Sequence, residues 1–411
     1  MCPARAGCVL VALLATACAT AGPLPGAPPV SGGAPIAAVA EAEEAALAGR
    51  IEPFEDPLLA EYLATIADRL ASADERESDA LPITITVVRD PSIGALALPT
   101  GRIYLHTGLL SRVANEAQLA TVLARELAHV RRMQGATLLV DPNAVDEALA
   151  RIGPGIVAGL SAGNEAGTNP LTAMASAILG KRLPLAHTGA MTGHGRALER
   201  DADSGALERL VRAAYDPKEA PRVFERLRRE ARRGGPAERF FLGTDAALAD
   251  RIDVMTQLVT TTFAVAAVVP DTVRQTADFE AALTPLVREN ARLELRAGRL
   301  RAAQEQLDRV LAHAPGDAPA HLYYGDLLRL RAQRARSVAD RDELARQALT
   351  MYERSGSLDP GLAEVPRQIG LLYYQQGRYD RAREAFERYV ARHPNAPDAA
   401  RVSEYVLALT R

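Results

Sequence analysis

Glu126 and His129 form a Glu-x-x-His pair whose residue types and spacing could support hydrolytic chemistry. Apolar residues recur around this pair with helical periodicity, so its two side chains lie near each other on one helix face. In the zinc-binding pattern His-Glu-x-x-His, both histidines hold the metal and the glutamate acts as the base for a metal-bound water. Here Arg125 occupies the first position of that pattern. A Glu-x-x-His pair alone is also typical of a solvated helix face, so its interpretation depends on other segments.

Several segments around this pair resemble metallopeptidase family forty-eight, which includes the CAAX prenyl protease and HtpX. Residues 115–124 are similar to the approach to the family's zinc motif, and residues 90–101 are similar to its "DPSINAFALPGG" segment. Downstream, residues 196–203 match its Arg-x-x-Glu-x-x-Ala-Asp segment, and residues 213–217 resemble its "AGYDP". The resemblance covers roughly residues 50–255, in the family's order. This part of the chain is identified as a member of the family.

The resemblance implies a role for each matching residue. Glu126 would be the general base, His129 the second metal ligand and Glu199 the third, with Asp203 as the support of that ligand. Zinc is the family's cofactor, but Arg125 stands where the first ligand should be. Guanidinium stays protonated and offers no acceptor, so it cannot bind a metal cation and repels one. Only two of the three protein ligands that a catalytic zinc normally uses remain, so we expect a drastic loss of affinity.

A second departure from the family concerns the position that gates the site. Periplasmic relatives carry a Thr-His-Pro segment there, whereas this chain has Asp245 in place of the histidine. Losses at two separate positions of one site favour a decayed catalytic centre. As a hypothesis, Arg125 lies between Glu126 and Glu199, and a salt bridge there replaces the zinc and holds two helices together.

Other residues could complete a metal site only from less favourable positions. His106 is at the end of an expected strand, and His187 lies in a stretch without clear periodicity. His194 precedes Glu199 by five residues, so on one continuous helix their side chains would point about 140° apart. Surface or packing roles are expected for all three histidines. Asp245 could serve as an oxygen ligand, but it would not remove the charge of Arg125.

Periodicity predicts an α+β fold for this region, mostly helical with a small sheet, and the family resemblance implies a zincin-like metallopeptidase domain whose sheet lies beside the cleft. Apolar residues at helical spacing predict helices, β-branched alternation predicts the first strand, and the turn at residues 99–101 precedes the second. The predicted helices are 58–70, 115–133 and 196–214, and the predicted strands are 83–88 and 102–106. Residues 135–195 remain unassigned.

The C-terminal third contains a repeat. The positions Gly298, Ala303, Leu307 and Pro315 recur at the same mutual spacings as Gly377, Ala382, Phe386 and Pro394. These spacings resemble the tetratricopeptide repeat, in which small residues let two antiparallel helices touch. Units begin near 280–284, at 318 and at 363, and an insertion around 331–341 lengthens the second. Three units and a final helix predict a short all-α solenoid.

The first residues resemble an export signal ending in a bacterial lipobox. Arg5 is the positive end, residues 9–15 are apolar, and Cys18 would carry the lipid. Alanine at position 19 indicates the outer membrane, by the rules for lipoproteins. The predicted organisation is a signal peptide (1–17), an Ala/Pro/Gly linker (18–49), a metallopeptidase-like domain (50–262), a connector (263–283), three repeats (284–396) and a capping helix (397–411).

Composition limits the functional classes. The 411 residues carry a formal net charge of −3, so a nucleic-acid binder with a broad cationic face is excluded. No apolar run after the signal reaches the ~20 residues that a membrane-spanning helix needs.

Three functions remain open. Because the family likeness, lipobox and repeats together most resemble the periplasmic beta-barrel assembly-enhancing proteases, the first is a non-proteolytic protein in outer-membrane protein biogenesis or envelope quality control. Its partners would be unfolded or misassembled envelope proteins, or outer-membrane assembly components, bound through the repeats on the periplasmic face of the outer membrane. The second is an active zinc endopeptidase with unusual ligands. The third is a repeat scaffold of an envelope complex.

Overall fold

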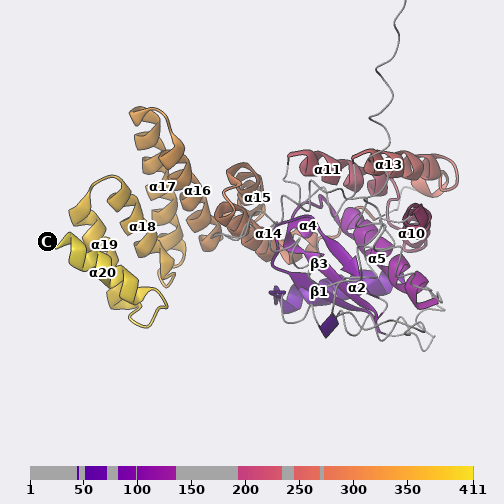
Figure 1. Cartoon of the computed structure of the whole chain (residues 1–411), viewed down its shortest axis with the longest axis horizontal. Coiled ribbons are helices and arrows are strands. Elements are labelled where there is room, and N and C mark those ends of the chain that lie inside the picture. The colour runs from indigo at the N-terminus through magenta and orange to yellow at the C-terminus, as the bar shows by residue number, and fades with distance from the viewer. Residues whose placement is uncertain are drawn as a thin grey trace, which may run out of the picture.

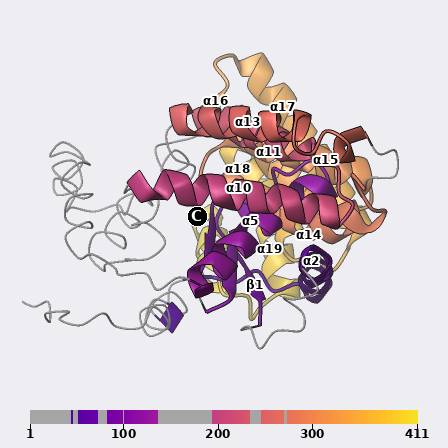
Figure 2. The same cartoon turned by 90° about the vertical axis from the view of Figure 1, so that its right-hand side faces the viewer.

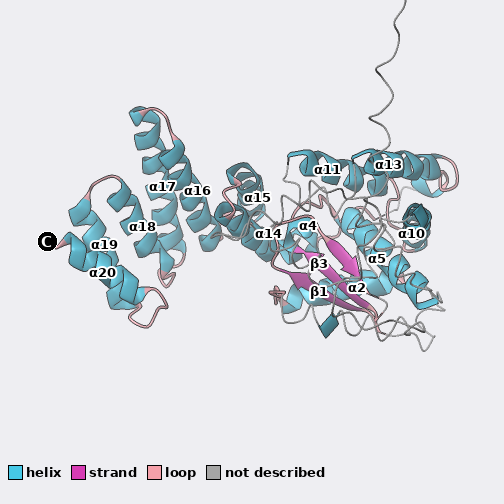
Figure 3. Cartoon of the chain, in the orientation of Figure 1, coloured by secondary structure: helices cyan, strands magenta, loops and turns pink. Residues whose placement is uncertain are grey.

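The computed structural model describes residues 44–45, 51–71, 82–98, 100–135, 193–233, 245–268 and 273–410. These residues form a mostly helical α+β fold with one small sheet, as predicted (Figure 3). The expected signal peptide, Cys18 and His187 lie outside the described residues. None of the described helices is both long and apolar enough to cross a membrane.

The sheet has three strands in the order β1-β3-β2. β1 (Thr84–Val88) pairs in parallel with β3 (Arg102–His106), and these are the two predicted strands. β2 (Ala95–Ala97) pairs antiparallel with β3 and was not predicted, because three residues are too short to show alternation.

Helix α5 (Glu116–Gly135) is the central element of the metallopeptidase-like part and carries the Glu-x-x-His pair. It packs against β2 and against the helices α2 (Pro57–Leu70), α10 (Gly193–Arg212) and α11 (Glu219–Arg233) (Figure 1). Its first turn is held by the buried carboxylate of Glu116, which accepts hydrogen bonds at 2.7 Å from the hydroxyls of Tyr62 and Tyr215. These contacts with distant segments fix where α5 begins, and therefore where its motif lies.

Helix α10 crosses close to α5 beside the motif, as Figure 2 shows. At the crossing, a Cβ added to Gly205 would lie 3.5 Å from the Cβ of Ala128. Small residues on both helices therefore bring their backbones together, which places Glu199 and Asp203 of α10 opposite Glu126 of α5.

The C-terminal part consists of three helical pairs and a final helix, as the repeat spacing predicts. The pairs are α14 (Asp278–Arg296) with α15 (Leu300–His313), α16 (Ala318–Arg334) with α17 (Val338–Leu358), and α18 (Glu364–Gln375) with α19 (Tyr379–Arg392); the final helix is α20 (Ala399–Leu409). The extra residues of the second unit lengthen α16 and α17 to 17 and 21 residues, against 12 and 14 in the third pair. This pair projects beyond its neighbours in Figure 1.

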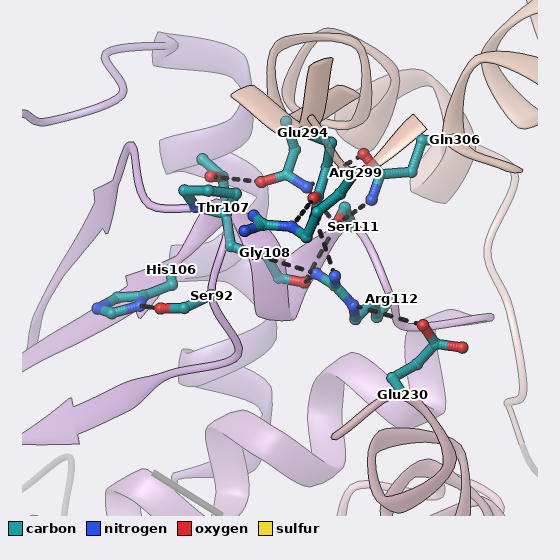
Figure 4. A network of polar contacts seen from close by, with 12 residues as sticks. Ser92, His106, Thr107, Gly108, Ser111, Arg112, Glu230, Glu294, Arg299 and Gln306 are labelled. Atoms are coloured by element: carbon teal, nitrogen blue, oxygen red, sulfur yellow. Dashed lines mark hydrogen bonds and ion pairs between the residues drawn. The ribbon is translucent and has the colours of Figure 1, made fainter. Parts of the chain in front are cut away.

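The first helical pair shares its core with the metallopeptidase-like part. Helix α14 begins at Asp278, inside the expected connector, and one continuous hydrophobic cluster extends from Leu59 to Leu327. A buried polar network joins the two parts (Figure 4). In it, Asn290 accepts a hydrogen bond from Thr107 at 2.9 Å and donates one to Ser111 at 3.1 Å.

An ion pair reinforces this junction. The Nη2 of Arg112 donates to the fully buried carboxylate of Glu294 at 2.9 Å. Removing either partner of such a pair leaves an uncompensated buried charge. The first helical pair is therefore an integral part of the metallopeptidase-like fold and not a separable module.

We expect a chain that ends at residue 283 to lack a cooperative thermal transition, because it exposes the shared core and leaves Arg112 without Glu294. A chain that ends at residue 362 should keep the transition, since it removes only α18 to α20, and α19 and α20 supply a separate hydrophobic cluster. Circular dichroism during heating measures both. Cooperative unfolding of the shorter chain would show that the junction is dispensable.

Candidate functional site

Helices α5 and α10 bring the residues assigned from the family motif together. The Nε2 of His129 lies 3.7 Å from Oε1 of Glu199. Glu126 and Asp203 are buried, with 3% and 1% of their surfaces exposed. The four side chains that the sequence singled out are thus part of one cluster between two helices.

The guanidinium of Arg125 lies among the carboxylates of this cluster. Its Nη1 donates to Oε1 of Glu126 at 2.7 Å, its Nη2 donates to Oε2 of Glu199, and its Nε lies 3.6 Å from Oδ1 of Asp203. The structure thus confirms that Arg125 forms ion pairs with both Glu126 and Glu199, as expected. It adds a third ion pair, between Arg125 and Asp203. One cation thereby joins α5 to α10.

Arg251 is a second cation of the cluster that sequence reasoning missed. It lies on helix α13 (Asp245–Thr260), and it binds Asp203 through two hydrogen bonds of 2.6 and 2.8 Å. Its Nη1 also lies 3.3 Å from Glu199, and its guanidinium is 4.5 Å from the centre of the Phe224 ring. A signal was available, because Arg251 falls at helical spacing from the buried Leu248 and Met255, where an apolar residue is expected.

The two cations set the protonation of the carboxylates. Burial alone would raise the pKa of Glu199, but the charges of Arg125 and Arg251 outweigh it and lower the pKa to about 2. Burial raises the pKa of Glu126 above its usual range, since the attraction of Arg125 only partly offsets it and Glu199 adds repulsion. The pKa of Arg125 is raised, because the three carboxylates outweigh its burial. The guanidinium therefore stays charged, and Glu199 stays ionised.

Asp245, expected at the gating position, is bound by helix α11. Its carboxylate accepts paired hydrogen bonds from Arg228, at 2.9 and 2.8 Å, and from Arg232, at 2.6 and 2.8 Å. These contacts lower the pKa of the exposed Asp245 carboxylate. Asp245 thus joins α13 to α11, and none of these contacts involves Glu126 or Glu199.

Two of the other histidines can be placed. His106 is mostly buried at the end of β3, where its Nδ1 lies 3.0 Å from the Ser92 hydroxyl, and burial lowers its pKa. His194 lies with Glu199 on the continuous helix α10, as assumed for the angle between them, but its side chain is outside the description.

The donors in this cluster do not fit a catalytic zinc. Within the described segments, no three His, Cys, Asp or Glu side chains are arranged to hold a metal ion. His129 and Glu199 occupy the second and third ligand positions of the family, and the first position is occupied by Arg125, whose guanidinium donates to the Glu199 carboxylate. In this structure these residues form ionic contacts between helices α5, α10 and α13.

Comparison with known proteins identifies the family of this chain. The model of peptidase family M48 matches residues 57–268, which is more than half of the chain. The chain belongs to this family. A tetratricopeptide-repeat model matches residues 335–406, which contain helices α17 to α19 and most of α20.

The similarity to relatives with named activities covers less than half of this chain. A putative beta-barrel assembly-enhancing protease of Vibrio cholerae is 32% identical over 186 residues, which is 43% of this chain and 34% of the relative. The beta-barrel assembly-enhancing protease of Escherichia coli K12 is 28% identical over 187 residues, or 45% and 36%. The mitochondrial metalloendopeptidase OMA1 of Saccharomyces cerevisiae is 31% identical over 192 residues, or 45% and 50%. The matches therefore span between a third and a half of each relative's length.

Replacing Arg125 with alanine should lower the free energy of unfolding by about 3 kcal/mol, because Glu126, Glu199 and Asp203 then share only Arg251. The matched control is Arg200→Ala on α10, whose pair with Asp250 is exposed and should contribute less than about 1 kcal/mol. Urea denaturation measures both. Equal stability of the Arg125→Ala variant and the parent would contradict a structural role for the guanidinium.

Acid should destabilise the protein through Glu199. Its pKa in the folded state is about 2, below the ~4.3 of an unfolded chain, so its contribution is present above about pH 4.3 and is lost as pH falls toward 2. Glu126 acts in the opposite direction, because its folded pKa is raised. The Glu199→Gln variant should therefore show a flatter loss of stability between pH 4.5 and 2.5, measured by urea unfolding at each pH. An unchanged acid slope would contradict this.

Proposed function

We propose that this chain is a non-proteolytic M48 protein that binds client proteins in outer-membrane protein assembly or envelope quality control. The observation that carries the proposal is the guanidinium of Arg125, which lies where the first zinc ligand of the family motif would be. It pairs with Glu126, the general-base position, and with Glu199, the third-ligand position. Both residues that hydrolysis would need are thus engaged by a side chain that stays charged.

Electrostatics supports the loss of zinc. A divalent cation placed between His129 and Glu199 would meet the charges of Arg125 and Arg251 in a mostly buried cluster, where repulsion is poorly screened. Glu199 would have to give up its bonds to these cations in order to bind the metal. The imidazole of His129 and one contested carboxylate do not compensate for this cost.

The repeats support a role in protein binding. Tetratricopeptide repeats stack helical pairs into extended surfaces that contact other proteins, and this chain has three pairs, the first of which is built into the M48 domain. Several relatives that match the M48 domain, including those of Vibrio cholerae and Escherichia coli, are named for beta-barrel assembly. The partners we propose are unfolded or misassembled envelope proteins, or components of the outer-membrane assembly machinery.

The proposed location is the periplasmic face of the outer membrane, with the lipid on Cys18. The lipobox-like residues before Cys18 and the alanine after it support this location.

An active zinc endopeptidase is the second candidate. The observation that favours it is the convergence of His129, Glu199 and Glu126, which lie together as hydrolysis would require. It requires that Arg125 leaves the cluster when a metal enters.

Metal content separates the two candidates. We expect the purified parent to hold less than about 0.1 zinc per chain after dialysis against micromolar zinc, and the Arg125→His variant to hold about one, because it restores a third ligand. The matched control is Arg125→Gln, which removes the charge without adding an imidazole and should remain largely metal-free. Elemental analysis of all three measures this.

Proteolysis of unfolded casein completes the test. The parent should be inactive, and any activity gained by Arg125→His should disappear in the Arg125→His/Glu126→Gln double variant. Stoichiometric zinc and casein cleavage in the parent would overturn the proposed function in favour of the endopeptidase.

A further inference from the structure

A small hollow lies at the junction between the M48 domain and the first helical pair. Its volume is about 120 Å³, several times the 10–15 Å³ that one water requires, so a group of a few heavy atoms fits. Three elements contribute its walls: the chain just after α4 (Thr107–Leu110), helix α11 and helix α15. The lining residues are Ser111, Arg112, Arg226, Glu230, Ala302, Glu305, Gln306 and Arg309.

Two of the three arginines that line the hollow are anchored by other contacts. Arg112 binds Glu294 and the carbonyl oxygen of Gly108, the latter at 2.6 Å. Arg309 binds Glu280 and donates to the carbonyl oxygen of Val113 at 2.9 Å. These bonds fix both guanidinium groups at the wall.

One buried hydrogen-bond donor at the hollow, the Nε of Arg112, has no acceptor among the described residues. Arg112 is 92% buried, yet its Nε has no hydrogen-bond partner, and the nearest carboxylate oxygen, on Glu230, is 3.9 Å away (Figure 4). Buried donors are normally satisfied, so an unpaired one needs an explanation. An acceptor in the hollow would provide it.

Arg226 is the third arginine that lines the hollow. Among the described residues, nothing forms a hydrogen bond or an ion pair with its guanidinium. Burial lowers its pKa, and repulsion by Arg309 and Arg229 adds to this, while Glu230 and Glu305 offset only part of it. A bound anion would relieve this repulsion.

We propose that the hollow is a binding site for a small oxyanion, a carboxylate or a phosphate group, held by Arg226 and by the Nε of Arg112. Planar guanidinium groups are suited to both oxyanions, because they offer paired donors. The site lies between the M48 domain and the solenoid, so the carboxylate of a bound protein segment could reach it from the repeats. The proposal stands whether or not the M48 domain hydrolyses peptides.

Isothermal titration of the full chain with inorganic phosphate at fixed ionic strength tests the site. We expect saturable binding at one site in the parent and at least tenfold weaker binding in Arg226→Gln. The matched control is Arg229→Gln, which makes the same charge change on the same helix outside the hollow and should bind within about twofold of the parent. Glu305→Gln removes a negative charge from the wall and should bind more tightly.

A second titration distinguishes the source of the oxyanion. An N-acetylated tripeptide with a free C-terminal carboxylate is compared with its C-terminal amide. Binding of the carboxylate form alone assigns the site to peptide termini, whereas binding of phosphate alone assigns it to phosphate. Failure of both oxyanions to bind, or equal binding by the parent and Arg226→Gln, would overturn the proposal. A metal-binding, proteolytically active parent would leave this result unaffected.

Discussion

The guanidinium of Arg125 is the interaction on which the arrangement of the M48 domain depends. It pairs with carboxylates on its own helix and on α10, and Arg251 extends the contacts to α13. In a zinc peptidase a divalent cation would balance such carboxylates. Here two side-chain cations do so, which keeps Glu199 ionised in a mostly buried position. The same replacement that removes a metal ligand therefore supplies the charge that the remaining acidic residues need.

A buried ionic cluster is costly to desolvate, and its geometry must be nearly complete to compensate. This explains why the small residues Ala128 and Gly205 matter: they let α5 and α10 approach closely enough for Arg125 to reach Glu199. The ion pairs of the cluster specify how α5 and α10 cross. Shortening the side chain of Arg125 or of Glu199 would leave a buried charge without its counter-charge.

The second constraint is the junction with the repeats. The junction buries Arg112, Glu294 and Asn290. Separating the first helical pair from the M48 domain would therefore break the buried ion pair of Arg112 with Glu294. The orientation of the solenoid relative to the M48 domain is thereby set at its first pair. A protein bound on the first helical pair would therefore be held in a defined position relative to the Arg125 cluster and to the junctional hollow.

Local patterns determined much of this protein from the sequence alone. Helical patterns located α2, α5 and α10, β-branched alternation located β1, the turn at residues 99–101 located β3, and repeated small residues located the three helical pairs. The identity of Arg125 was sufficient to predict its salt bridge, because the family motif placed Glu199 opposite it. These features depend on residues that are close in sequence or are joined by one motif.

Tertiary structure alone decided the rest. Arg251 binds Asp203 of the cluster, Asp245 binds arginines of α11, and Arg226 lines the hollow. Each of these contacts depends on how α13 and α11 pack against other helices. The fusion of the first repeat with the M48 domain has the same origin, since its contacts join residues about 180 positions apart, such as Arg112 and Glu294. Periodicity indicates which face of a helix is buried, but not which other helix covers that face. The covering helix determines which charged side chains meet, where a cavity forms and what the site can bind.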